Sequence, residues 1–121
     1  LLIADFKHPD EAAHLNFTGV SGEAVRRNLE RAADAGAAML IRIPLIHGVN
    51  DDDAALEGFR AALAPFAGRA NVEVLRYHEY GKDKWAKAGQ TYQMEDAFLP
   101  AGRAEALEKL LRSEGINVVR T

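Results

Sequence analysis

The chain has 121 residues, of which 48% are hydrophobic and 27% charged, with a net charge of −3. This length and composition are typical of one globular domain and argue against disorder. The charge argues against a general nucleic-acid-binding face, and no apolar run approaches the ~20 residues of a membrane span. Because there is no cysteine, this chain cannot form a disulfide or ligate an iron–sulfur cluster through thiolates.

The sequence starts within an apolar run, Leu1-Leu2-Ile3-Ala4. The run predicts a short buried strand over residues 1–5. Because complete proteins rarely begin inside a buried strand, we expect the chain to be a piece of a longer protein. Proline, glycine and scattered polar residues then predict a loop over residues 6–20.

A helix is predicted from Ser21, a suitable N-cap, to Gly36, a residue type that favours the left-handed position after a helix. A second strand is predicted over residues 38–46, a near-continuous apolar run that Arg42 interrupts. Pro44 lacks an amide N–H, which indicates either an edge strand or the end of the strand.

The second half of the chain continues the alternation of helix and strand. Asn50 or Asp51 is expected to cap the next helix. Further along, the pattern predicts a third strand over residues 72–75, a long loop over 79–100, a last helix over 103–114 and a fourth strand over 116–119. This order predicts an α/β fold with a parallel sheet and right-handed crossovers.

Polar residues that could carry chemistry follow the predicted strands. Asp5 and Lys7 share one side of the first strand, where they could bind a ligand with hydroxyl and carboxylate groups or form only a surface ion pair. Arg42 points either inward, toward a negative ligand or a carboxylate, or onto a solvated face. Together with Tyr77 and His78, these residues indicate one ligand-binding edge, because ligands of parallel α/β folds bind at the carboxyl ends of strands.

Five segments, spread over the whole chain, carry a family resemblance. They are ADFKH (4–8), TGVS (18–21), IRIPLIHGVNDD (41–52), LRYHEYGKDKW (75–85) and EGINVV (114–119). In this order and spacing they resemble the C-terminal half of the glycyl-radical-enzyme activating enzymes, which are radical S-adenosylmethionine proteins. The resemblance implies a partial TIM-type (β/α) barrel, of which residues 1–121 form one domain of about three βα units and a short C-terminal strand. The half that carries the CxxxCxxC loop and its [4Fe–4S] cluster would be absent.

The resemblance also implies roles for individual residues. Asp5 and Lys7 match D-x-K positions that contact S-adenosylmethionine, and Asp5 could also help hold a monovalent cation. Pro44 falls at a position that lines the adenine pocket, and His78 matches a histidine near the adenosyl group. Arg42 matches a strand arginine that faces the glycine loop of a partner enzyme. No residue of this chain is expected to be catalytic by itself.

For the longer protein, the resemblance implies reductive cleavage of S-adenosylmethionine to a radical that abstracts hydrogen from a glycine of a partner such as pyruvate formate-lyase. It further implies an electron donor such as flavodoxin and a cytoplasmic location, with no nucleic-acid or membrane partner. Two alternatives stay open: a radical S-adenosylmethionine enzyme that acts on a small molecule, and a non-catalytic half-barrel that only assembles with other proteins.

The isolated chain is expected to pair with a second copy. Its first strand would have an unpaired edge, and its concave face would expose apolar side chains such as Ile41 and Ile43.

Overall fold

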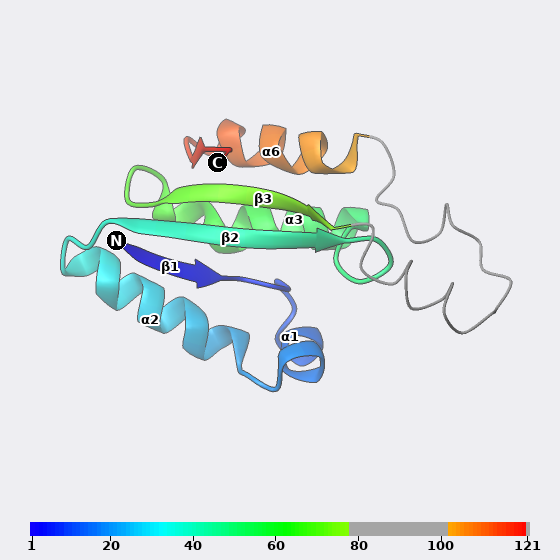
Figure 1. Cartoon of the computed structure of the whole chain (residues 1–121), viewed down its shortest axis with the longest axis horizontal. Coiled ribbons are helices and arrows are strands. Elements are labelled where there is room, and N and C mark those ends of the chain that lie inside the picture. Colours follow the sequence, from blue (N-terminus) through cyan, green and yellow to red (C-terminus); the bar gives the residue numbers. More distant parts are fainter. Residues whose placement is uncertain (78–101, 121) are drawn as a thin grey trace, which may run out of the picture.

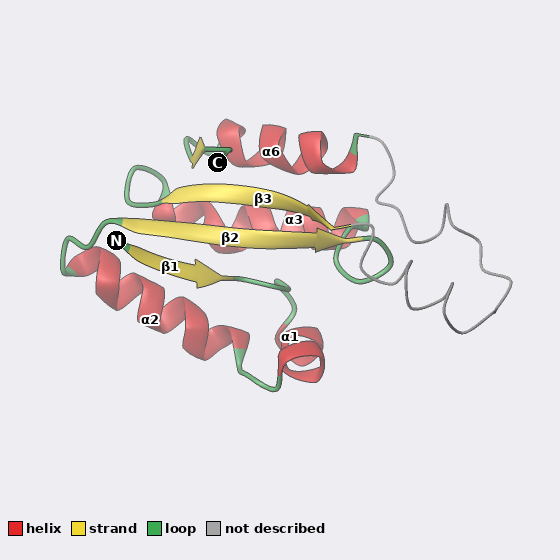
Figure 2. Cartoon of the chain, in the orientation of Figure 1, coloured by secondary structure: helices red, strands yellow, loops and turns green. Residues whose placement is uncertain are grey.

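The structure, a computed structural model, describes residues 1–77 and 102–120 (Figure 1). Strands and helices alternate along these residues (Figure 2). The strands are β1 (Leu2–Asp5), β2 (Met39–Ile46), β3 (Asn71–Tyr77) and β4 (Asn117–Val118), and the helices are α1 (Glu11–Thr18), α2 (Gly22–Asp34), α3 (Asp53–Leu63), the 3₁₀ turn η1 (Ala64–Phe66) and α6 (Arg103–Ser113).

The four described strands form one sheet in the order β1-β2-β3-β4, and every neighbouring pair is parallel. Strand order follows chain order, so each crossover moves the chain one strand along the sheet. This arrangement confirms the predicted α/β fold with a parallel sheet. Within the described residues the sheet does not close on itself, so it has the form of a partial barrel.

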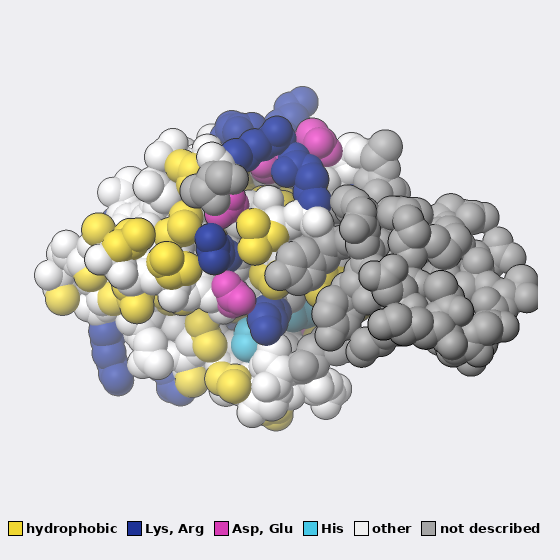
Figure 3. All heavy atoms as spheres, in the orientation of Figure 1, with side chains coloured by type: hydrophobic (Ala, Val, Ile, Leu, Met, Phe, Trp, Pro, Cys, Tyr) yellow, Lys and Arg dark blue, Asp and Glu magenta, His cyan; other side chains and the backbone are white. Residues whose placement is uncertain are grey.

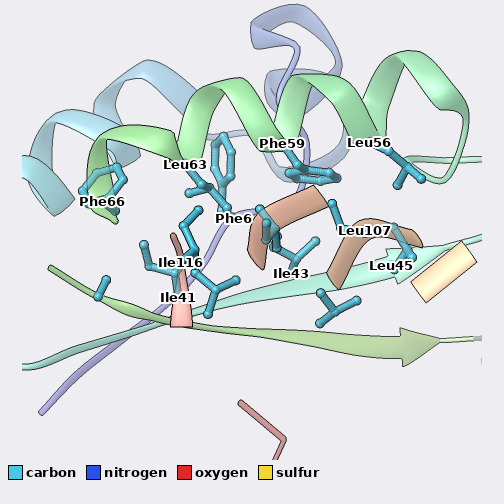
Figure 4. Close-up of a cluster of buried hydrophobic side chains, with 14 of the residues drawn as sticks. Phe6, Ile41, Ile43, Leu45, Leu56, Phe59, Leu63, Phe66, Leu107 and Ile116 are labelled. Carbon is cyan, nitrogen blue, oxygen red and sulfur yellow. The ribbon is translucent and has the colours of Figure 1, made fainter. Parts of the chain in front are cut away.

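The hydrophobic core lies between the sheet and the helices. Figure 4 shows Phe59 and Leu63 of α3 above Ile41 and Ile43 of β2. Leu107 of α6 is fully buried in the same cluster. Burying side chains of this size stabilises the fold by roughly 1.5–3 kcal/mol each.

The alternation of side chains along β2 shows which residues face the helices. Ile41, Ile43 and Leu45 are fully buried in the core. The expectation that Ile41 and Ile43 line the concave face is therefore wrong, because side chains alternate along a strand and Arg42, which lies between them, takes the opposite face. No described helix covers the other face of the sheet, which is called the open face from here on. The Arg42 side chain lies on this open face.

Helix α1 lies where a loop was expected. Asp10 caps its start by accepting a hydrogen bond from the Ala13 amide at 3.1 Å, and Gly19 ends it with a φ of 74°. Both residues are standard capping signals. The helix escaped prediction because its apolar residues form no continuous stripe, and pattern alone favoured a loop.

Other boundaries agree with the sequence to within a few residues. Ser21 caps α2 through a hydrogen bond from the Ala24 amide. The cap of α3 is Asp52, one residue beyond the two expected candidates, and its side chain accepts from the Ala55 amide at 2.7 Å. The segment predicted as a long loop, 79–100, lies outside the described residues.

Candidate cofactor-binding site

The open face carries a row of charged side chains across three strands. The register pairs Asp5 with Arg42 and Arg42 with Glu73, so an acid, a base and a second acid lie side by side on β1, β2 and β3. Figure 3 shows positively and negatively charged side chains in a row across the sheet, with histidine side chains close by and hydrophobic side chains on either side of the row. The carboxyl edge is where parallel α/β folds bind ligands.

Arg42 and Glu73 form the central ion pair of this row. Arg42 Nε lies 3.5 Å from Glu73 Oε1, and the two side chains are 36% and 4% exposed. The Nε atom has no hydrogen bond within the described residues. The partly exposed guanidinium therefore keeps donors for another group on the open face.

Asp5 and Lys7 are both exposed at the point where β1 leaves the sheet. The residue between them, Phe6, is buried in the core, where it stacks on His14 and meets Phe59 edge to face. Because successive side chains of an extended segment alternate, a buried Phe6 places Asp5 and Lys7 on the opposite, open face. A carboxylate and an ammonium group two residues apart suit a ligand that carries both charges.

Pro44 lies near the end of β2, two residues before Ile46, and β2 is a central strand of the described sheet. Its missing N–H falls on the side of β1, because Arg42 and Ala38 accept hydrogen bonds from Phe6 and Leu2 on that side. By this point β1 has left the sheet. The expectation of an edge position is thus wrong for the strand as a whole but describes the local surroundings of Pro44.

The turn over residues 47–52 connects β2 with α3 and holds several polar contacts. Asp51 accepts hydrogen bonds from His47 Nδ1 at 2.7 Å and from the Gly48 amide at 2.9 Å. His8 donates through Nε2 to the Val49 carbonyl at 3.1 Å, which ties the segment after β1 to this turn. These contacts make the turn a rigid border of the candidate site.

Arg103, the first residue of α6, also contacts this turn. Its guanidinium donates to the Asp51 carbonyl at 2.9 and 2.6 Å and to Asp53 at 2.8 Å. The turn is therefore held both by the segment after β1 and by the first residue of α6. Sequence reasoning assigned none of these contacts, since they join residues some 40 to 50 positions apart.

Asn50 has a larger role in the turn than the helix cap that the sequence predicts. Its side chain is buried, with 1% of the residue exposed. It donates to the carbonyls of Lys7 and Pro44 and accepts from the Ile46 amide, each at 2.8 Å. The only signal in the sequence was an amide residue in the turn after a strand.

Two of the expected contributions are not tested by the structure. His78 lies outside the described residues, so its position relative to Lys7 stays a prediction. For Asp5 as a cation ligand, no group of three or more His, Asp or Glu side chains suited to a metal occurs in residues 1–77 and 102–120. The contact of Asp5 with a monovalent cation stays a prediction as well.

None of the helices that the structure describes is long and apolar enough to cross a membrane.

Comparison with known proteins identifies relatives along almost the entire chain, although no family model matches it. The chain is 36% identical over 120 residues to the trans-4-hydroxy-L-proline dehydratase activating enzyme of Clostridioides difficile, a match that covers 97% of this chain and 39% of that protein. It is 35% identical over 98 residues to the choline trimethylamine-lyase activating enzyme of Oleidesulfovibrio alaskensis, covering 78% of this chain and 32% of that protein. The chain thus spans well under half the length of either relative.

Solved structures agree with these relatives. A domain of a pyruvate-formate lyase-activating enzyme from Bacteroides vulgatus superposes with a TM-score of 0.74 at 28% identity, covering 98% of this chain and 65% of that one. A radical SAM methyltransferase from Sphaerobacter thermophilus, at 21% identity and a TM-score of 0.64, covers 98% of this chain and 32% of that one and shows the shared fold alone. The resemblance read from the five segments is confirmed: the chain is a homologue of the glycyl-radical-enzyme activating enzymes and matches a part of such proteins.

Proposed function

We propose that this chain is the C-terminal half of a radical S-adenosylmethionine enzyme that installs a glycyl radical on a partner enzyme. The proposal rests on homology to activating enzymes together with one structural observation, the row of Asp5, Arg42 and Glu73 that crosses the open face from the carboxyl end of β1. In this proposal the chain forms one wall of the cofactor site, and a half that precedes it carries the cluster cysteines.

The donor set of the open face fits S-adenosylmethionine. Its methionine moiety carries an ammonium and a carboxylate group, and its ribose carries hydroxyls. The Asp5 carboxylate accepts hydrogen bonds from the ammonium or the hydroxyls, whereas the Lys7 ammonium binds the carboxylate. Pro44 and His78 border the adenosyl group. When bound with a [4Fe–4S] cluster, this cofactor supplies the radical chemistry; the residues of this chain bind and orient it.

Arg42 is proposed to face the glycine loop of the partner enzyme. Its free donors suit the carbonyl groups of an extended backbone, which is how a loop without large side chains would be recognised. The identity of the partner, an electron donor such as flavodoxin, the cytoplasmic location and the pairing of two copies all remain predictions. Among the alternatives, a radical S-adenosylmethionine enzyme with another substrate is compatible with the fold, which a methyltransferase shares, but the sequence relatives are activating enzymes.

The coding sequence upstream of Leu1 gives a first test, since the proposal requires a CxxxCxxC segment there.

The second test measures S-adenosylmethionine binding by calorimetry in the full-length, anaerobically reconstituted protein. Lys7→Ala should weaken binding about tenfold or more, the loss expected when a hydrogen bond to a charged group is removed. Lys109→Ala, an exposed lysine on α6, is the matched control and should bind as the wild type does. Equal binding by the Lys7 and Lys109 variants would contradict the assignment.

A further inference from the structure

Asn50 uses every hydrogen-bonding position of its carboxamide except one oxygen lone pair. The two Nδ2 hydrogens go to the carbonyls of Lys7 and Pro44, and Oδ1 accepts from the Ile46 amide, all at 2.8 Å. The side chain is buried, so a change in any of these contacts leaves a polar group without water. Two of the three partners belong to the wall assigned to the cofactor.

The position of this carboxamide follows from the ladder between β1 and β2. Leu2 donates to the Ala38 carbonyl and Phe6 donates to the Arg42 carbonyl, so the even-numbered residues of β2 face β1. If the ladder continued, the backbone of residue 8 would donate to Pro44 and accept from Ile46. The Asn50 side chain makes these same two bonds. It therefore occupies the next rung of the sheet in place of a β1 peptide group.

Pro44 makes this substitution necessary. It has no N–H, so it cannot bond the Phe6 carbonyl, and the ladder ends there. The chain after Phe6 is free to turn out of the sheet, and the second Nδ2 hydrogen of Asn50 holds it at the Lys7 carbonyl. One carboxamide thus finishes β2 and fixes the backbone from which the Lys7 side chain extends.

We propose that Asn50 is a positioning residue for the cofactor wall, acting through the backbone of Lys7 and Pro44. The proposal rests on the assignment of Lys7 to S-adenosylmethionine binding. Asn50 itself does not contact S-adenosylmethionine in this proposal. It sets where the Lys7 ammonium lies relative to Asp5, and a misplacement of about 1 Å in a binding group can reduce function by up to ~100-fold.

The test compares Asn50→Asp with the wild type in the full-length protein. The aspartate keeps the shape of the side chain but cannot donate, and it places a negative charge beside the two carbonyls. Asp52→Ala is the matched control, because it removes the α3 cap in the same turn and touches neither Lys7 nor Pro44. The readouts are the Kd for S-adenosylmethionine, the Tm without it, and hydrogen exchange of peptides that cover residues 1–10.

We expect Asn50→Asp to raise the Kd by about tenfold or more, with faster exchange in residues 1–10. The Asp52→Ala control should lower the Tm with an unchanged Kd. An unchanged Kd in a folded Asn50→Asp protein would overturn the proposal, as would equal losses of affinity in both variants. If Asn50→Asp does not fold, Asn50→Ser takes its place, since its hydroxyl can still donate one hydrogen bond; failure of both to fold would show a purely structural role and also overturn it.

Lys7→Ala separates this proposal from the function on which it rests. If Lys7→Ala weakens binding and Asn50→Asp does not, the positioning role is wrong while the cofactor assignment stands. If neither variant changes the Kd, the assignment of Lys7 itself is wrong.

Discussion

The register of β2 and β3 places the buried carboxylate of Glu73 beside Arg42. Its position alone does not distinguish a cofactor ligand from a partner contact. The two roles differ in what they require: a cofactor ligand affects every turnover of S-adenosylmethionine, whereas a partner contact affects only the transfer to glycine. This difference makes the role of Arg42 testable by two assays on one variant.

We predict that Arg42→Ala in the full-length protein reduces glycyl-radical formation on the partner by about tenfold or more, the loss typical of a central interface arginine. Cleavage of S-adenosylmethionine without the partner should fall much less. Radical yield is measured by electron paramagnetic resonance, and 5′-deoxyadenosine by chromatography. Arg112→Ala, which alters an exposed arginine of α6, serves as the control. Equal losses in both assays would count against a partner-facing role.

At the scale of elements, the segment after β1 packs closely on α3. A Cβ atom at Gly58 would lie 2.8 Å from the Cβ and Cγ atoms of Pro9, closer than carbon atoms approach without displacement. The glycine is thus required by the packing of a helix against the segment that carries Lys7 and His8. Helix propensity alone would favour alanine at this position by about 1 kcal/mol.

We predict that Gly58→Ala destabilises the chain despite this gain in propensity, because overpacking costs about 1–3 kcal/mol. The measurement is a urea titration of the 121-residue chain. Ala61→Gly, at an exposed position of the same helix, shows the propensity effect alone and should cost about 1 kcal/mol. A Gly58→Ala chain more stable than the wild type would refute the close contact.

Helix α6 is joined to the sheet by a buried carboxylate. Glu108 accepts hydrogen bonds from Arg120 at 3.1 and 2.6 Å and from Arg76 at 3.4 Å. The hydrogen bonds from Arg120, assisted by the charges of Arg120 and Arg76, lower the pKa of Glu108 from its ordinary value of 4.5. A carboxyl group with a lowered folded-state pKa stabilises the fold above its unfolded pKa and loses that contribution as the pH falls through the folded value.

The chain should therefore lose stability as the pH falls from about 5 to the lowered pKa of Glu108. In the Glu108→Gln variant, stability should depend less on pH over this range. Thermal unfolding from pH 7 to pH 3 measures the effect. Glu30→Gln, an exposed glutamate of α2, is the control and should follow the wild type. If the Tm of Glu108→Gln fell with pH as steeply as that of the wild type, the contribution of the Glu108 ion pairs would be contradicted.

Across the whole molecule, the sequence predicts what depends on local periodicity and leaves open what depends on register. The alternation of strands and helices and the Ser21 cap follow from neighbouring residues. The face that Ile41 takes depended on that of Arg42, whose orientation the sequence left open. The role of Asn50 also stayed hidden, since its partner Lys7 is 43 residues away and meets it only after the sheet has formed.

The described sheet has an apolar edge at β1. Leu1, Leu2 and Ile3 are 85%, 42% and 49% exposed, and in the described residues no strand pairs with β1 on its outer side. An edge of this kind presents free N–H and C=O groups beside apolar side chains, which favours pairing with another strand. In the proposed longer protein this surface belongs to the boundary with the preceding half, so the 121-residue chain alone exposes what that half would cover.

We therefore predict that the isolated chain associates through β1, and that sedimentation velocity at micromolar concentration detects a dimer or larger species. Ile3→Lys should shift the chain to monomer, because a charge on an edge strand opposes pairing with a second apolar edge. Leu15→Lys places the same charge at an equally exposed leucine of α1, outside the strand, and should leave association unchanged. A wild-type chain that sediments as a monomer would show that the β1 edge does not suffice to hold two copies together. If both lysine variants became monomeric, net charge rather than strand pairing would govern the association.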